Sequence, residues 1–421
     1  MNAGGIIRSG AAKAGHVLLC AALLGTAAAC STKGGGGTAA VGVTGGEIHL
    51  GVLSDLTGPF KAPAEQQNLG IQLYWDQKNA AGGTCGRRIV LETRDHGYDP
   101  QKAVSLAGEL NDKVLAYQIS VGSPTSLAIR PELEDHRVMA IAMSWSPELG
   151  RSPALVVPGT YFDAEAIDAF DYLVERGDIE RGDTVGHVYF QGDFGEPALA
   201  GLRYAGRRNG VTVKAVQVDP SITDLTSQVA ALKDAGVKAI FVNAAPPQLA
   251  SLAGLSEAGG MDVPIVASMG AYAPQLLDTN VASILEKRAL VVGSVTAYSG
   301  DAAAATKVRA LYEKSNSKVP PSQMVVLGFA ISAVLDQAMT RACDGGKTLD
   351  RRTLWDVFHG KFTIDTQGAT VPLDYSKPGA SPSDKIIVLR PAKGVPGGLD
   401  VVEADYAGPT VARFADEPPQ K

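Results

Sequence analysis

Short apolar stretches alternate with longer amphipathic stretches along most of this chain, and this alternation constrains the fold more than any other feature. A short apolar run bounded by glycine or proline is typical of a strand, whereas apolar residues at helical spacing indicate a helix. Repetition of strand and helix predicts a parallel sheet with helices on both faces. The first series has expected strands at 48–53, 88–94, 114–121 and 138–143, and expected helices at 66–78, 100–111 and 125–136.

A second series of the same kind follows, so the chain is expected to contain two doubly wound α/β units. In open α/β sheets a ligand binds beyond the carboxyl ends of the strands, which predicts a cleft between the two units. The portion from residue 291 onwards is too short for a third unit, and we expect it to return and complete both sheets. The expected strands are 184–190, 211–218, 239–243, 264–268 and 386–390, and the expected helices are 195–208, 225–235, 247–258, 324–341 and 350–359.

The composition is that of a globular protein. Hydrophobic residues make up 45% of the 421 residues and charged residues 19%. A chain of this length exceeds what one core usually holds, which again predicts two domains. The net charge of -6 argues against nucleic acid as a partner, since phosphate binding relies on clustered Lys and Arg. Beyond the N-terminal region we expect no apolar run as long as the ~20 residues of a membrane span.

The N-terminus has the features of a signal peptide. Arg8 and Lys13 supply positive charge, residues 17–24 form a short apolar run, and three alanines at 27–29 supply the small residues that a signal peptidase requires. We therefore expect residues 1–29 to be removed and the protein to be exported, to the periplasm or the outer face of the cytoplasmic membrane.

Cys30 directly follows these alanines, in an arrangement that resembles the lipobox of bacterial lipoproteins. That resemblance implies that Cys30 is lipidated and anchors the protein to the membrane. Residues 30–46 are rich in glycine and contain no aromatic residue, so we expect a flexible, lipid-anchored linker. Ordinary secretion with cleavage near Ala29 is the alternative.

No motif for catalysis or cofactor binding is present. The six histidines lack the spacing of a metal site, and the chain has neither a G-x-S-x-G elbow nor a C-x-x-C pair. The sequence Gly345-Gly346-Lys347-Thr348 lacks the first glycine and the preceding strand of a phosphate loop. We expect no cofactor, no metal and no enzymatic activity, although an enzyme stays an alternative because active sites need not follow known motifs.

Four segments, read in order, resemble one family. They are GEIHLGVLSDLTGPF at 46–60, the segment from LYWDQK to SLAGEL at 73–110, QGDFGEPALAGLR at 191–203 and DLTSQVAALKDAGVKAIFV at 224–242. Together they look like the solute-binding protein of an ABC transporter, of the branched-chain amino acid (Leu/Ile/Val-binding) type. The resemblance implies a type I periplasmic-binding-protein fold, an α/β fold of two Rossmann-like lobes with parallel sheets joined by a three-strand hinge. It also implies that a small solute is captured and passed to an ABC permease and ATPase complex.

The same resemblance implies the domain boundaries and a disulfide. Lobe 1 would comprise residues 47–160 and 294–370, and lobe 2 residues 161–293 and 371–421. Cys85 and Cys343 are the cysteines that remain beyond the signal region, and the family places both positions in one lobe. In an exported protein such a pair favours a disulfide over a metal site.

Candidate ligand contacts follow from the loops that hold the ligand's carboxylate in this family. Here these loops are residues 121–126 and 143–147, and Ser123 and Ser144 match the family's hydroxyl contacts. A helix that begins after Ser123 would add its dipole for an anion, although the serines could instead serve as helix caps. The further candidates, which follow strand ends or match family positions, are Trp145, Ser146, Asp163, Phe194, Ala245, Met269, Phe60 and Tyr272.

Two features of these candidates leave the ligand open. Trp145 and Phe194 could equally be core residues, as aromatic side chains often are. The carboxylate that commonly pairs with the ligand's ammonium should fall near Met269, and none is there. Either Asp163 takes that role or the ligand, an amino acid or a related carboxylate or amide, has no α-amino group. A ligand-sensing receptor of the same fold is the alternative to a transporter component.

Overall fold

The computed structural model describes residues 40–416 of the chain. The expected signal peptide, the lipidation site Cys30 and most of the expected linker lie outside the described residues. Residues 40–46 were expected to belong to the flexible linker, but here they pack against lobe 1. The amide of His49 donates to the carbonyl of Gly42 over 2.8 Å, and Val43 forms an antiparallel bridge with Ile48. The flexible stretch was therefore predicted too long at its C-terminal end.

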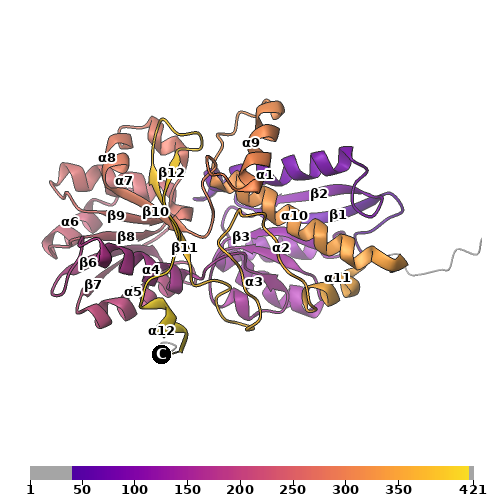
Figure 1. The fold of residues 1–421 in the computed structure, drawn as a ribbon, viewed down its shortest axis with the longest axis horizontal. Coiled ribbons are helices and arrows are strands. Elements are labelled where there is room, and N and C mark those ends of the chain that lie inside the picture. Colours follow the sequence, from indigo (N-terminus) through magenta and orange to yellow (C-terminus); the bar gives the residue numbers. More distant parts are fainter. Residues whose placement is uncertain (1–39, 417–421) are drawn as a thin grey trace, which may run out of the picture. The chain divides into compact units, whose positions relative to one another are not determined.

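Lobe 1 is built around a five-stranded parallel sheet with the strand order β2-β1-β3-β4-β5. Every residue of β3 is buried, as expected for a parallel sheet that helices cover on both faces. Helices α1 and α10 pack together over this lobe (Figure 1). Its elements are β1 (Glu47–Ser54), α1 (Lys61–Ala80), β2 (Arg88–Asp95), α2 (Pro100–Leu110), β3 (Ala116–Val121), α3 (Ser123–Asp135), β4 (Ala140–Met143), η1 (Leu149–Arg151), β5 (Leu155–Val156), α9 (Ala303–Ser315), α10 (Gln323–Cys343), η4 (Asp344–Gly346) and α11 (Arg351–Phe358).

Lobe 2 is built around a seven-stranded sheet with the order β12-β11-β10-β9-β8-β6-β7. Its first five strands in chain order are parallel, and helices α4 and α5 pack together over them. Its elements are α4 (Phe162–Glu175), β6 (Thr184–Phe190), α5 (Gly195–Asn209), β7 (Thr212–Val218), α6 (Thr226–Asp234), β8 (Ile240–Asn243), α7 (Pro246–Ala258), β9 (Ile265–Ser268), η2 (Met269–Ala271), η3 (Pro274–Asp278), α8 (Ala282–Arg288), β10 (Ala289–Gly293), β11 (Ile386–Pro391), β12 (Leu399–Tyr406) and α12 (Val411–Asp416).

The last portion of the chain completes only one sheet, which corrects the expectation that it would complete both. Strands β11 and β12 join the sheet of lobe 2 in antiparallel pairs, while helices α9 to α11 pack on lobe 1. The direction of β11 has a simple cause. The chain leaves lobe 2 at the end of β10 and comes back from lobe 1 at the start of β11, so the two neighbouring strands must run in opposite directions.

Three segments of the described chain, residues 157–161, 294–302 and 359–385, connect the lobes and are bonded to one another. The amide of Thr160 donates to the hydroxyl of Ser294 over 2.7 Å, which joins the first segment to the second. The hydroxyl of Tyr375 donates to the carbonyl of Val157 over 2.8 Å, which joins the third segment to the first. Through these hydrogen bonds the three connecting segments are held to one another.

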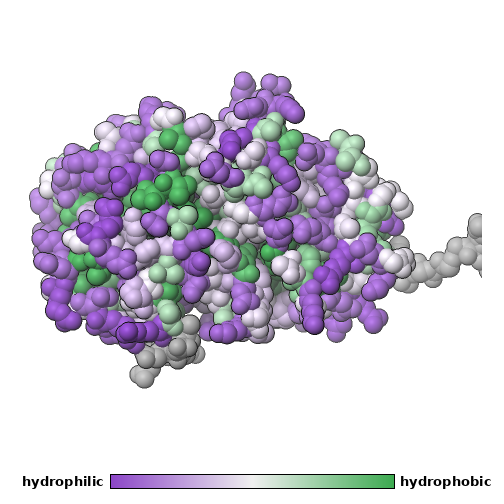
Figure 2. All heavy atoms as spheres, viewed as in Figure 1, coloured by the Kyte–Doolittle hydropathy of each residue, from purple (hydrophilic) through white to green (hydrophobic). Residues whose placement is uncertain are grey.

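Helix α10 corrects the expectation that no later apolar run is long enough for a membrane span. The helical stretch Gln323–Gly346 passes that test by length and composition, but 89% of its most apolar window is buried in the protein, as in a core helix. It packs closely on α1, because a Cβ on Gly70 would lie 2.1 Å from the carbonyl oxygen of Val325. The face of the molecule shown in Figure 2 is largely hydrophilic, with smaller groups of apolar residues between.

A disulfide joins Cys85, in the turn after α1, to Cys343 at the end of α10, as the family resemblance implied. It closes a chain separation of 258 residues. Cross-links over long loops restrict the unfolded chain strongly, so we expect the Cys85→Ser/Cys343→Ser variant to lose about 2–4 kcal/mol of its free energy of unfolding. Urea unfolding of the ligand-free protein measures this. Reduction of the wild type should reproduce the loss, and equal midpoints for all three samples would contradict the prediction.

Candidate functional site

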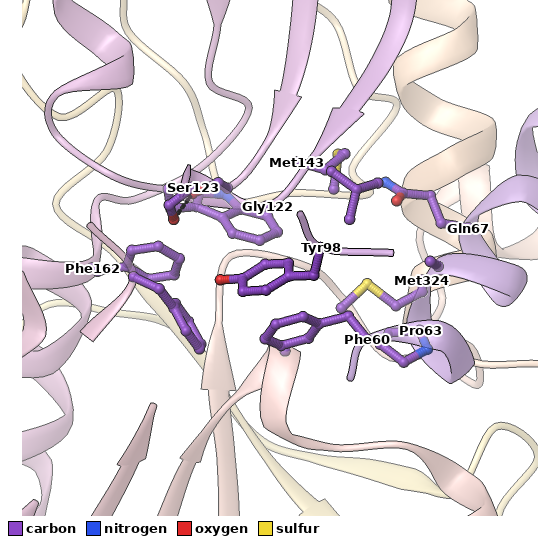
Figure 3. Close-up of a pocket in the computed structure, with 15 residues that line it drawn as sticks. Phe60, Pro63, Gln67, Tyr98, Gly122, Ser123, Met143, Phe162 and Met324 are labelled. Atoms are coloured by element: carbon purple, nitrogen blue, oxygen red, sulfur yellow. Dashed lines mark hydrogen bonds between the residues drawn. The ribbon is translucent and has the colours of Figure 1, made fainter. Parts of the chain in front are cut away.

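A pocket that is partly open to solvent lies between the lobes at the carboxyl ends of their strands. This is the position expected for a ligand in a doubly wound fold. Lobe 2 contributes Phe162, Phe194 and Gly270 to its wall. Lobe 1 contributes the larger share, which is Phe60, Pro63, Ala64, Gln67, Tyr98, Val121, Gly122, Ser123, Met143, Ser144, Trp145 and Met324 (Figure 3).

Buried Asp55, which follows β1, fixes the loop that presents Phe60 to the pocket. Its carboxylate accepts hydrogen bonds from the amide of Gly58 over 2.6 Å and from the amide of Phe60 over 2.8 Å. Burial raises the pKa of Asp55, and these backbone bonds oppose that rise. Phe60 is therefore held in place by its own backbone as well as by packing.

Gly122 directly follows β3 and lets an aromatic ring approach the backbone. Its φ is 93°, and a Cβ there would lie 2.7 Å from a ring carbon of Tyr98. Tyr98 follows β2, and its hydroxyl points toward Phe162 across the pocket in Figure 3. Burial raises the pKa of Tyr98 above its ordinary value, so the phenol stays neutral and can donate a hydrogen bond.

Two hydroxyl groups meet at one side of the pocket. Ser123 begins α3 and Ser144 follows β4, and their Oγ atoms lie 2.5 Å apart. Both residues are buried, at 2% and 3% exposure. The first turn of a helix has N–H groups without an intrahelical partner and carries the positive end of the helix dipole. Hydroxyls beside such a turn suit an anionic group such as a carboxylate.

Five aromatic side chains form much of the rest of the wall and join the two lobes. The ring centroid of Phe60 lies 4.9 Å from the ring centroid of Tyr98 and 5.7 Å from that of Phe194. The ring centroid of Phe162 lies 5.0 Å from that of Phe194 and 6.0 Å from that of Trp145. Because these rings contact one another across the cleft, an apolar body that packs against them would contact both lobes at once.

Trp145 also touches the connection between the lobes. A Cβ on Gly159, in the first connecting segment, would lie 2.0 Å from the indole Nε1 and 2.7 Å from the Oγ of Ser294. The indole therefore lies between the pocket and the hinge. A ligand that moves this ring would act on a segment that connects the lobes.

The structure brings five of the predicted contacts to the pocket wall, which are Phe60, Ser123, Ser144, Trp145 and Phe194. Five others lie outside the wall. Tyr272 turns away, because its hydroxyl donates to the carbonyl of Gly398 over 2.7 Å. Ser146 accepts a hydrogen bond from the amide of Glu148. Ala245 and Met269 are buried in lobe 2, and Asp163 accepts from the amide of Ala164 over 2.8 Å.

Several wall residues have an acidic neighbour in the sequence, namely Glu65, Asp99, Asp163 and Asp193, but none of these lines the pocket. Burial raises the pKa of Asp163 to about 6. Burial also raises the pKa of Glu165, which is 3% exposed, to about 8. No Asp or Glu occurs among the residues that line the pocket. Among residues 40–416, no cluster of three or more His, Cys, Asp or Glu residues could hold a metal ion.

Sequence reasoning missed several residues of the wall, among them Gln67, Tyr98, Phe162 and Met324. Tyr98 and Phe162 carried a usable signal, because each follows a strand end by a few residues. Gln67 and Met324 carried none, since they belong to helices that meet only through the packing of α1 on α10.

Residues 47–394 match the family described as periplasmic binding protein. A curated relative is the Leu/Ile/Val-binding protein homolog 3 of Brucella melitensis, which is 24% identical over 363 residues, or 84% of this chain and 94% of the relative.

Solved structures share the fold. One is a fatty acid ABC transporter substrate-binding protein from Thermomonospora curvata, with 34% identity and a TM-score of 0.87 over 89% of this chain and 96% of that one. Another is a branched-chain amino acid ABC transporter protein from Thermus thermophilus with bound valine. It has 16% identity and a TM-score of 0.76 over 87% of this chain and 98% of that one.

Proposed function

The chain belongs to the periplasmic binding protein family, and from this premise we propose that it captures a carboxylic acid with an apolar body. The acid binds in the pocket between the lobes and passes unchanged to an ABC importer. The protein is exported and anchored through Cys30 to the membrane. The observation that carries the proposal is that one side of the wall holds a hydroxyl pair beside a helix N-terminus, while the remainder is largely apolar.

The absence of an acidic side chain from the wall argues against an α-amino acid. An ammonium group that is buried without a partner costs several kcal/mol. Asp163 lies outside the wall, so it offers the ammonium no contact in this conformation. An acid without an amine avoids this cost. The relative from Thermomonospora curvata, described as a fatty acid transporter component, supports the same class of ligand.

A calorimetric titration of the ligand-free protein tests the proposal. We expect octanoate to bind, and octanol and methyl octanoate to bind at least tenfold more weakly, because neither carries the charge that the hydroxyls and the helix terminus receive. Leucine should also bind more weakly, since its ammonium finds no carboxylate. Tighter binding of leucine than of any acid without an amine would overturn the proposed ligand class.

A further inference from the structure

Gln67 is a polar residue in the apolar part of the pocket wall. It lies on α1, is 3% exposed, and its Nε2 has no hydrogen-bond partner among residues 40–416. In Figure 3 its amide end points toward Met143, within the ring of residues that line the pocket. A buried amide without a partner is destabilising, and the place of this one in the pocket wall allows a ligand to complete its hydrogen bonding.

The neighbouring glutamine shows that this helix can satisfy a buried amide. Gln66 accepts a hydrogen bond from the hydroxyl of Ser322 over 2.6 Å and donates to the side chain of Gln275 over 3.2 Å. The Nε2 of Gln67 has no such partner among residues 40–416, and the wall residues labelled on its side of Figure 3 are Pro63, Met143 and Met324. The backbone at Gln67 is also fixed, since a Cβ on Gly328 of α10 would lie 2.1 Å from the carbonyl oxygen of Gln67.

Gln67 and the hydroxyl pair lie on opposite sides of the pocket. Figure 3 shows Gln67 and Met324 on one side, Ser123 and Phe162 on the other, and Tyr98 between them. A ligand whose carboxylate reaches Ser123 would therefore direct its far end toward Gln67. Its apolar middle would pass along the rings of Tyr98 and Phe60.

We propose that Gln67 selects ligands that carry a second hydrogen-bonding group at the far end of the apolar body. This inference rests on the proposed function, since it assumes that the carboxylate lies at Ser123. An amide can donate and accept, so a terminal hydroxyl or carbonyl group satisfies it. A methyl end would leave the amide without a partner. The favoured ligands are thus hydroxylated, oxidised or dicarboxylic acids with an apolar middle.

The test compares each straight-chain acid from hexanoate to dodecanoate with its ω-hydroxy derivative, by titration calorimetry on the ligand-free protein. We expect the hydroxy acid to bind at least about tenfold more tightly at the chain length that reaches Gln67, because a buried polar group discriminates against a partner that lacks the matching group. In Gln67→Met, which keeps length and removes the amide, the ratio should fall to about one or below.

A matched control is Gln72→Met, which changes an exposed glutamine on the same helix whose Nε2 donates to the carboxylate of Asp76. It should keep the wild-type ratio. Equal binding of plain and hydroxy acids at every length, or an unchanged ratio in Gln67→Met, would overturn the role of Gln67 and leave the proposed function standing. If no acid of either series binds, the proposed function fails and the inference fails with it.

Discussion

Replacing both Ser123 and Ser144 with alanine should weaken the binding of octanoate about ten- to hundredfold. Their hydroxyls form a buried pair 2.5 Å apart in the pocket wall. One hydroxyl donates to the other, and the second proton is left for a ligand oxygen. A hydrogen bond to a charged group contributes about 1.5–3 kcal/mol, which corresponds to this loss of affinity. Both residues are replaced because either hydroxyl alone could turn to the ligand. Titration calorimetry gives the ratio of dissociation constants.

The matched control is Ser146→Ala. Ser146 is a buried serine of the same loop, but its Oγ accepts from the amide of Glu148 and it does not line the pocket. Its replacement should leave the affinity within about twofold of the wild type, since it removes no ligand contact. Thermal unfolding without ligand shows whether each variant is folded. A folded double variant that binds octanoate like the wild type would show that the hydroxyl pair does not hold the carboxylate.

Replacing Glu165 with glutamine should make the ligand-free protein more resistant to alkaline pH. Burial on α4 raises the pKa of Glu165 to about 8. Between its ordinary pKa, near 4.5, and about 8, the folded protein keeps this carboxyl protonated while the unfolded chain ionises it. The folded state then binds more protons, so the free energy of unfolding falls as the pH rises through this window. The loss from this one group is on the order of a few kcal/mol.

Urea unfolding at pH 5, 7 and 9 measures this effect. We expect wild type and Glu165→Gln to differ little at pH 5, and the variant to be the more stable by the largest margin at pH 9. Burial raises the pKa of Asp163, Asp168 and Asp171 on the same helix as well, so part of the decline should persist in the variant. Glu196→Gln, at an exposed position, should follow the wild type. If the free energy of unfolding fell equally with pH in wild type and Glu165→Gln, the raised pKa of Glu165 would be contradicted.

The sequence predicted the architecture well because local periodicity and chain order determine it. The alternation of strands and helices predicted both doubly wound units and the cleft between them. Ser123, Ser144 and Trp145 lie in the pocket wall because they follow the ends of β3 and β4, and their role in binding stays a prediction. The carboxyl ends of parallel strands meet at one edge, so position along the chain predicts position in the site.

Contacts between distant segments could not be predicted in this way. Tyr272 follows a strand end like the others, but it bonds to Gly398 in the β11–β12 connection, 126 residues later. Met324 reaches the pocket only because α10 packs on α1. Helix α10 is apolar because most of it is buried inside the protein, as in a core helix. Each of these outcomes depends on tertiary packing that no local pattern records.

The most direct test of the central claim is to prepare the protein without ligand, add octanoate and determine a crystal structure of the mixture. The claim is that the cleft holds an apolar carboxylic acid by its charged end. We predict a carboxylate oxygen within hydrogen-bond distance of the Ser123 or Ser144 hydroxyl, and the alkyl chain along the rings of Tyr98 and Phe60. An octanoate molecule bound outside this cleft, or with its carboxylate directed away from both serines, would contradict the claim.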